Sequence, residues 1–247
     1  MPETPGIGEK ALNKAAEIGL SSQLDEVETL DVNIKTEPLK LIQGEVEQVN
    51  IVGEGLVMQK DLRITELEMQ ITSVAINPLS VAFGQIELTR PTKGKTQVVL
   101  TEADINRAFN SEYVRDKLQN HQITINGQAT AITPQHIDFH LPGEGKITIN
   151  ASILLRATGE IKQIGFSAVP DISDNGKNIY LKNVEYGESQ EISPELTQAL
   201  IEETSEILNL SNFDLEGMSL RVYKLELAKG KLILQAEADV DKIPTAE

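Results

Sequence analysis

Residues 146–157 carry the alternating pattern that most constrains how this chain folds. The pattern places five apolar residues on one face: Ile147, Ile149, Ala151, Ile153 and Leu155. A period of two is typical of a β-strand with one buried and one solvated face. At about 3.3 Å per residue this strand would span about 40 Å, roughly twice the usual length. Because residues 231–239 repeat the pattern, we expect an apolar sheet face that is too long for turns alone to cover.

Three segments have the spacing of amphipathic helices and are the natural cover for such a face. The first is residues 7–20. The second is residues 101–118, which begins with a threonine suited to capping and has Asp104 three residues later. The third begins with Ser193 as its cap and Pro194 at the first helical position. At 1.5 Å per residue each helix would be about 20–27 Å long, which suits a long sheet.

Most of the remaining chain has the alternation of β-strands. The predicted strands are residues 27–36, 45–52, 55–60, 62–76, 83–89, 122–132, 136–141, 146–157, 160–169, 177–185, 219–228 and 231–239. Asp174-Asn175-Gly176 predicts a hairpin turn, because Asn-Gly accepts positive φ. Within residues 62–76 the apolar positions change parity twice, which indicates bulges that bend and twist a strand. We therefore predict an α+β protein whose antiparallel sheet curls, in one domain at residues 7–243 with flexible ends at 1–6 and 244–247.

Composition excludes several classes of function. The chain has 22 Lys and Arg against 38 Asp and Glu, a net charge of −16, and no basic run, so a nucleic-acid partner is not expected. It has no cysteine, which removes disulfides, thiolate nucleophiles and Cys-ligated zinc. With five Phe, four Tyr and no Trp, its interior is mostly aliphatic, which suits acyl chains and equally any β-rich core. The dispersed negative charge predicts a monomer.

The start of the chain and its hydropathy bear on location. No window approaches eighteen consecutive apolar residues, so we expect no membrane-spanning helix. The first six residues lack the basic and apolar regions of an export signal. The expectation is a cytoplasmic protein that is peripheral to a membrane, or a periplasmic one if an export signal has been removed.

Tests for catalytic and metal-binding constellations favour ordinary structure. Alternation places His136, Asp138 and His140 on one solvated face, but next-but-one strand residues lie about 6.6–6.8 Å apart, too far to converge on zinc. Residues 171–176 begin like a calcium loop, yet the twelfth position is Lys182 where that loop needs an acid. No serine sits in a Gly-x-Ser-x-Gly elbow. We therefore expect no enzyme activity, no metal and no cofactor.

Ordered landmarks along residues 7–240 resemble a known bacterial family. They are Leu41-Ile42-Gln43-Gly44-Glu45-Val46, Val49-Asn50-Ile51-Val52-Gly53-Glu54-Gly55-Leu56, Asp61-Leu62-Arg63-Ile64, Asn77-Pro78-Leu79, Phe83-Gly84-Gln85-Ile86, residues 98–108 and residues 220–234. Together these landmarks are similar to those of the LmeA-like phospholipid-binding proteins of cyanobacteria and actinobacteria.

The resemblance implies both a fold and a function. It implies a tubular lipid-binding module of the BPI-like kind, in which a strongly curved antiparallel sheet wraps around amphipathic helices. It also implies non-catalytic binding of a phospholipid or other acyl lipid, and leaves open whether the protein also transfers the lipid. Relatives often carry an export signal or an N-terminal anchor, which the start of this chain does not resemble.

We therefore hypothesise that acyl chains lie in a hydrophobic groove between the curved sheet and the helices. The candidate lining residues are Leu67, Met69, Ile71, Ile147, Ile149, Ile153, Leu155, Leu232 and Leu234. The same side chains would also serve as plain core. Two alternatives are open: an interaction or scaffold module with a closed core and no ligand, which needs an exposed apolar patch, and a hydrolase of unrecognised type, which needs a cleft with a perturbed acid or histidine.

Overall fold

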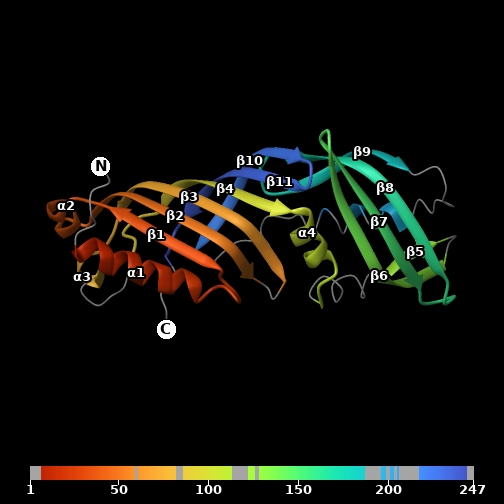
Figure 1. The fold of residues 1–247 in the computed structure, drawn as a ribbon, viewed down its shortest axis with the longest axis horizontal. Helices are drawn as coiled ribbons and strands as arrows, with labels where there is room; N and C mark the ends of the chain where they lie inside the picture. Colours follow the sequence, from red (N-terminus) through yellow and green to blue (C-terminus); the bar gives the residue numbers. More distant parts are fainter. Residues whose placement is uncertain are drawn as a thin grey trace.

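The computed structural model describes residues 7–58, 61–81, 86–112, 122–125, 128–186, 196–198, 201–202, 205 and 217–243. Most of these residues belong to two antiparallel sheets. The sheets follow one another along the long axis of an elongated molecule (Figure 1). The fold is thus mainly antiparallel β-structure with a few helices, and it has two sheets where the sequence analysis expects one.

The first sheet has six strands in the order β1-β2-β3-β4-β11-β10. These strands are β1 (Thr29–Lys35), β2 (Glu45–Met58), β3 (Leu62–Ala75), β4 (Thr92–Thr101), β10 (Met218–Ala228) and β11 (Lys231–Val240). The second sheet has five strands in chain order: β5 (Gln122–Ile125), β6 (Gln128–Gly143), β7 (Lys146–Leu155), β8 (Ile161–Ile172) and β9 (Ile179–Tyr186). The named helices are α1 (Ile7–Ser21), α2 (Pro38–Ile42), α3 (Pro78–Val81) and α4 (Glu102–Phe109).

Most predicted elements are present, with some changes of boundary. The first helix is confirmed as α1. The second begins with the predicted capping box of Thr101 and Asp104 but ends at Phe109, and residues 113–118 of the prediction lie outside the described residues. The turn at residues 174–176 joins β8 to β9, and Gly176 has a φ of +69°. Residues 196–198, 201–202 and 205 are helical within the predicted third helix, whose proposed caps lie outside the described residues. Of the predicted strand at 83–89, the described part makes only an isolated bridge through Leu88.

The strand β4 is absent from the sequence-based list because its inward positions are not uniformly apolar. Gly94 and Thr96 face inward together with Val98 and Leu100. Gly94 is needed for close packing, since a Cβ there would lie 3.0 Å from the Ile71 side chain. Thr96 is tolerated because its hydroxyl donates to the carbonyl of Glu68 at 2.9 Å. Close packing at Gly94 and the hydrogen bond of Thr96 therefore allow these two residues to face inward although neither is a large apolar residue.

The parity changes predicted within residues 62–76 occur where β2 and β3 are both irregular. The pairing omits Gly55 opposite Thr65 and Glu47 opposite Ser73, while the register on either side is unchanged. Gly55 and Ser73 have φ values of +60° and +59°. At each of these two pairs of positions, the inward-facing residues of both strands change from even to odd numbers or the reverse. Apolar side chains therefore stay on the inner face as the sheet bends.

Side chains of α1 cover the free edge of β1. Backbone N–H groups of Val32, Ile34 and Thr36 donate to Glu17, Asn13 and Glu9 at 3.5, 2.9 and 3.1 Å. The three acceptors are spaced four residues apart and so lie on one side of the helix. Covering an edge strand in this way satisfies its polar groups and blocks pairing with another chain.

The helix α4 covers the edge of β6 by the same device and thereby links the two sheets. The Asn106 amide exchanges two hydrogen bonds of 2.7 Å with the backbone of Phe139, and Asn110 does the same with Ile137 at 2.8 and 3.3 Å. Glu102 accepts from the Leu141 N–H at 2.6 Å. Figure 1 shows α4 between the sheets, where it positions the second sheet against the first.

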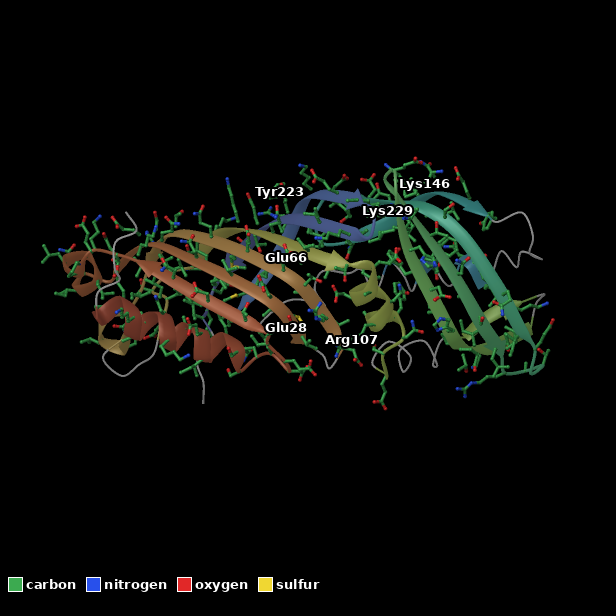
Figure 2. All side chains as sticks on the ribbon, in the orientation of Figure 1. Glu28, Glu66, Arg107, Lys146, Tyr223 and Lys229 are labelled. Atoms are coloured by element: carbon green, nitrogen blue, oxygen red, sulfur yellow. The ribbon has the colours of Figure 1, made fainter. Side chains whose placement is uncertain are left out.

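The concave side of the second sheet is filled by large side chains. Phe139 and Phe166 are almost completely buried, and Phe109 of α4 stacks on Phe139 with ring centroids 5.7 Å apart. Leu196 is also fully buried in this cluster. On the outer side, Tyr223 bulges from β10 between Val222 and Lys224 and points away from the sheet (Figure 2). Space for a ligand must therefore be sought on the first sheet.

Candidate functional site

An apolar cavity, here called the central cavity, lies on the concave side of the first sheet. All sixteen described residues that line it are apolar: Leu20, Leu24, Leu30, Ile51, Leu56, Met58, Ile64, Leu67, Met69, Val98, Leu100, Met218, Leu220, Val222, Leu234 and Ala236. Its volume free of protein atoms is about 890 Å³ when the space open to solvent is included. The centre of a water-sized sphere fits into only about 60 Å³ of it. The cavity is therefore a narrow apolar slot.

The curvature of the sheet brings its two edges to the same cavity. Leu30 belongs to β1 and Leu220 to β10, the outermost strands of the six, and both line the slot. Leu20, from the last turns of α1, closes one side. Leu24, Leu30, Leu67 and Leu220 are only partly buried, whereas most of the other lining residues are buried. These four leucines mark where the slot meets solvent.

A second apolar cavity, here called the end cavity, lies under α1 and adjoins the first. Between its walls lie about 480 Å³, of which only about 20 Å³ admits the centre of a water-sized sphere, and it is lined by apolar residues of α1, β1, β2 and β3, among others. Leu20, Ile51 and Met218 line both cavities. The two spaces thus share a wall, and together they follow the concave side of the first sheet.

Methionine is concentrated at the central cavity. The chain has four methionines, and the three that belong to the described residues, Met58, Met69 and Met218, all line this cavity. The methionine side chain is unbranched and flexible, so it adapts to irregular and changing shapes. By contrast, the described phenylalanines fill the core of the second sheet. Flexible methionine side chains therefore gather at the slot, and phenylalanine rings gather in the neighbouring core.

The predicted lining residues are distributed over both sheets. Leu67, Met69 and Leu234 line the central cavity, and Ile71 lines the end cavity. Leu232 is buried in the first sheet and lines neither cavity. The four residues of β7 are 0–6% exposed within the phenylalanine-rich core and line neither cavity: Ile147, Ile149, Ile153 and Leu155. Sequence analysis did not identify the contributions of α1, β1 and β10, and the methionine positions were the signal that could have indicated the cavity.

A buried carboxylate fixes α4 next to the central cavity. Asp104 is 5% exposed, and Arg63 donates to it at 2.7 Å; Thr65 and Thr101 also donate to it. Burial alone would raise the pKa of Asp104, but the hydrogen bonds from Thr101, Thr65 and Arg63 outweigh it and lower the pKa below its ordinary value of 3.8. Asp104 is therefore ionised at neutral pH. Its role is structural, because it joins β3 to the first turn of α4.

The polar constellations considered from the sequence have structural partners. His136 lies 2.9 Å from Asp138, and His140 lies 3.4 Å from Glu102, with both histidines exposed. Asp171 accepts a hydrogen bond from Lys182 at 2.6 Å, the residue at the twelfth position of the apparent calcium loop. Among the residues that the structure describes, no three His, Asp or Glu side chains gather into a metal-ligand set.

No described helix has the length and apolar character needed to cross a bilayer. The fold and the site together define a mainly antiparallel β-protein with an open, wholly apolar slot in one of its two sheets. The chain belongs to the LmeA-like phospholipid-binding family, whose profile matches residues 4–237. No curated protein and no solved structure matches the chain significantly. The family is one of lipid-binding proteins and is not a known family of enzymes.

Proposed function

We propose that this protein binds a phospholipid, or a lipid with similar acyl chains, by placing the chains in the central cavity. The observation that carries the proposal is the apolar character of the slot, whose sixteen described lining residues include no charged or polar side chain. The family match supports a phospholipid as the ligand. The curved first sheet with α1 along it then serves as the groove of a tubular lipid-binding module, and the binding involves no catalysis.

The energy available from burial is sufficient without a charged headgroup clamp. Burial of each methylene contributes about 0.8 kcal/mol, so a dozen methylenes contribute about 10 kcal/mol before the costs of ordering. The slot is narrow, and binding therefore requires its walls to move apart. The flexible side chains of Met58, Met69 and Met218 and the partly exposed leucines at its edge permit that movement.

A scaffold module with a closed core would fit the interior of the second sheet better than that of the first. The second sheet has the filled interior that a scaffold requires, whereas the first has an apolar slot that reaches solvent. We also propose that the protein acts as a monomer that contacts a membrane peripherally, without a nucleic-acid partner. Transfer of lipid between membranes is a further step of the same proposal.

Native mass spectrometry of the purified protein tests the proposal. We expect a mass increment that disappears after organic extraction, and we expect the extract to contain a phospholipid or another acyl lipid. The delipidated protein should regain the increment after incubation with phosphatidylcholine vesicles. A protein that carries no lipid and acquires none from vesicles would contradict the proposal.

A further inference from the structure

Three large apolar side chains project from one end of the molecule. Leu39 and Ile42 of α2 and Leu79 of α3 are 72%, 73% and 73% exposed, more than any other large hydrophobic residue described as exposed. None of the residues of α2 is buried. Both helices lie at the end of the first sheet farthest from the second sheet (Figure 1). We call residues 38–44 and 77–81 the apolar tip.

The backbone holds the two parts of the tip together. The N–H of Ile76 donates to the carbonyl of Gly44 at 2.8 Å, so the end of α2 lies against the start of α3. Gly44 has a φ of +79°, and a Cβ at this position would lie 2.4 Å from the Ile76 carbonyl oxygen. Asn77 accepts from the N–H of Leu79 at 3.1 Å and fixes the first turn of α3. The exposed side chains are thus presented by a defined structure.

The charge of the tip differs from that of the rest of the protein. The chain contains 38 Asp and Glu residues, yet residues 38–44 and 77–81 contain none. Their one charged residue, Lys40, forms ion pairs with Glu37 and Glu47, which flank the tip. Three exposed apolar side chains on a segment with no acidic residue of its own suit a partner that is itself apolar below a neutral surface.

The tip is continuous with the apolar interior. Ile76, which contacts Gly44 through the backbone, lines the end cavity together with Val46, two residues after Gly44. The end cavity in turn shares the side chains of Leu20, Ile51 and Met218 with the central cavity. A row of apolar side chains therefore leads from the tip, under α1, to the proposed lipid site.

We propose that the apolar tip inserts into the surface of a zwitterionic bilayer. The choice of a bilayer as the partner rests on the proposed lipid-binding function, because a bilayer is the source of the ligand. Leu39, Ile42 and Leu79 enter the acyl region, as the apolar residues of interfacial helices do. Anionic lipids weaken the contact at low salt, since the protein is strongly acidic.

Vesicle flotation with phosphatidylcholine vesicles tests the surface. The triple variant Leu39→Glu, Ile42→Glu, Leu79→Glu should bind at least about tenfold more weakly than the wild type, because three exposed apolar side chains are replaced by charged ones. The matched control is Val52→Glu, Ile161→Glu, Tyr223→Glu, which adds the same charge at exposed apolar positions elsewhere and should bind within about twofold of the wild type. Equal binding by the two triple variants would overturn the proposal.

Tryptophan fluorescence gives a second, independent measurement because the chain has no tryptophan. The Leu79→Trp emission should shift to shorter wavelength with vesicles and should be quenched by phosphatidylcholine brominated on its acyl chains. The emission of Ile161→Trp, placed on an exposed residue of the second sheet, should not change. No shift at Leu79→Trp would contradict insertion.

Binding of monomeric lysophosphatidylcholine separates this proposal from the proposed function. The tip triple variant should bind it as well as the wild type does, since the cavities are unaltered. If the wild type binds lysophosphatidylcholine but not vesicles, the tip proposal is wrong and the lipid site stands. If it binds neither, the lipid site itself is wrong. If the tip substitutions leave vesicle binding intact but abolish a contact with another protein, the tip is a protein interface and not a membrane one.

Discussion

We expect the substitution Leu67→Glu to weaken phospholipid binding by at least about a hundredfold, which corresponds to about 2.7 kcal/mol. Leu67 lines the central cavity and is partly exposed, so a glutamate is hydrated there in the free protein and the fold is retained. An acyl chain in the slot would remove water from the carboxylate without supplying a partner. Burial of an unpaired polar group costs about 2–7 kcal/mol, and that of a charge costs more. Equilibrium transfer of a pyrene-labelled phosphatidylcholine from vesicles measures the effect.

The matched control for this prediction is Leu225→Glu. Leu225 is also a partly buried leucine of the first sheet, but it does not line either cavity. The Leu225→Glu variant should bind the labelled lipid as the wild type does. A steric variant, Ala236→Phe, fills the slot from a buried lining position and should reduce binding without adding charge. If Leu67→Glu, Ala236→Phe and the control all bind equally, the central cavity is not the lipid site.

The largest effect on stability is expected for Asp104→Ala, about 3 kcal/mol less favourable for folding. This change removes the capping carboxylate of α4 and leaves the Thr65 and Thr101 hydroxyls without their acceptor. It also removes one of the two acid partners of Arg63, whose side chain is 23% exposed. Loss of one member of a buried ion pair typically costs about 3–5 kcal/mol, and the remaining contact between Arg63 and Glu28 places this case at the lower limit. Urea denaturation at pH 7 measures it.

The pH dependence of this effect follows from the lowered pKa of Asp104. A carboxyl whose pKa is lower in the folded state stabilises the protein above its unfolded pKa, and the contribution is lost as the pH falls through the folded pKa. The difference in stability between the wild type and Asp104→Asn should therefore be full at pH 7 and diminish below about pH 4. Glu28→Gln, which alters the exposed partner of Arg63, should change stability by no more than about 1 kcal/mol. A difference that does not depend on pH would contradict the assignment of an ionised Asp104.

The alternation in residues 146–157 predicted a strand correctly but could not identify its neighbours. Ile147, Ile149 and Ile153 do face inward, as the pattern requires. Alternation defines which face of a strand is dry, and it contains no information about what fills the space opposite. Here Phe139 and Phe166 lie beside Ile149 on the same face of the sheet, and Phe109 of α4 stacks on Phe139. Whether a strand face lines a cavity or a packed core depends on the tertiary structure.

The sequence also did not reveal that helices cover the sheet edges, although the regular spacing of the polar residues that do so is visible in it. Glu9, Asn13 and Glu17 recur every four residues, as do Glu102, Asn106 and Asn110. A polar stripe of this kind is ordinarily a solvated helix face. In this fold the stripe accepts hydrogen bonds from a strand instead, and only the placement of β1 and β6 reveals it. The alternation of apolar residues indicated one sheet, whereas the structure has two.

The central claim is that acyl chains occupy the central cavity of the first sheet and not the packed core of the second. A phosphatidylcholine with a photoactivatable diazirine on its acyl chain, loaded from vesicles and irradiated, tests this claim most directly when the adducts are located by peptide mass spectrometry. The predicted result is labelling of peptides that contain Met58, Met69 or Met218, with none on residues 146–155 of β7. Labelling that is concentrated on β7, or scattered over the outer surface, would contradict the claim.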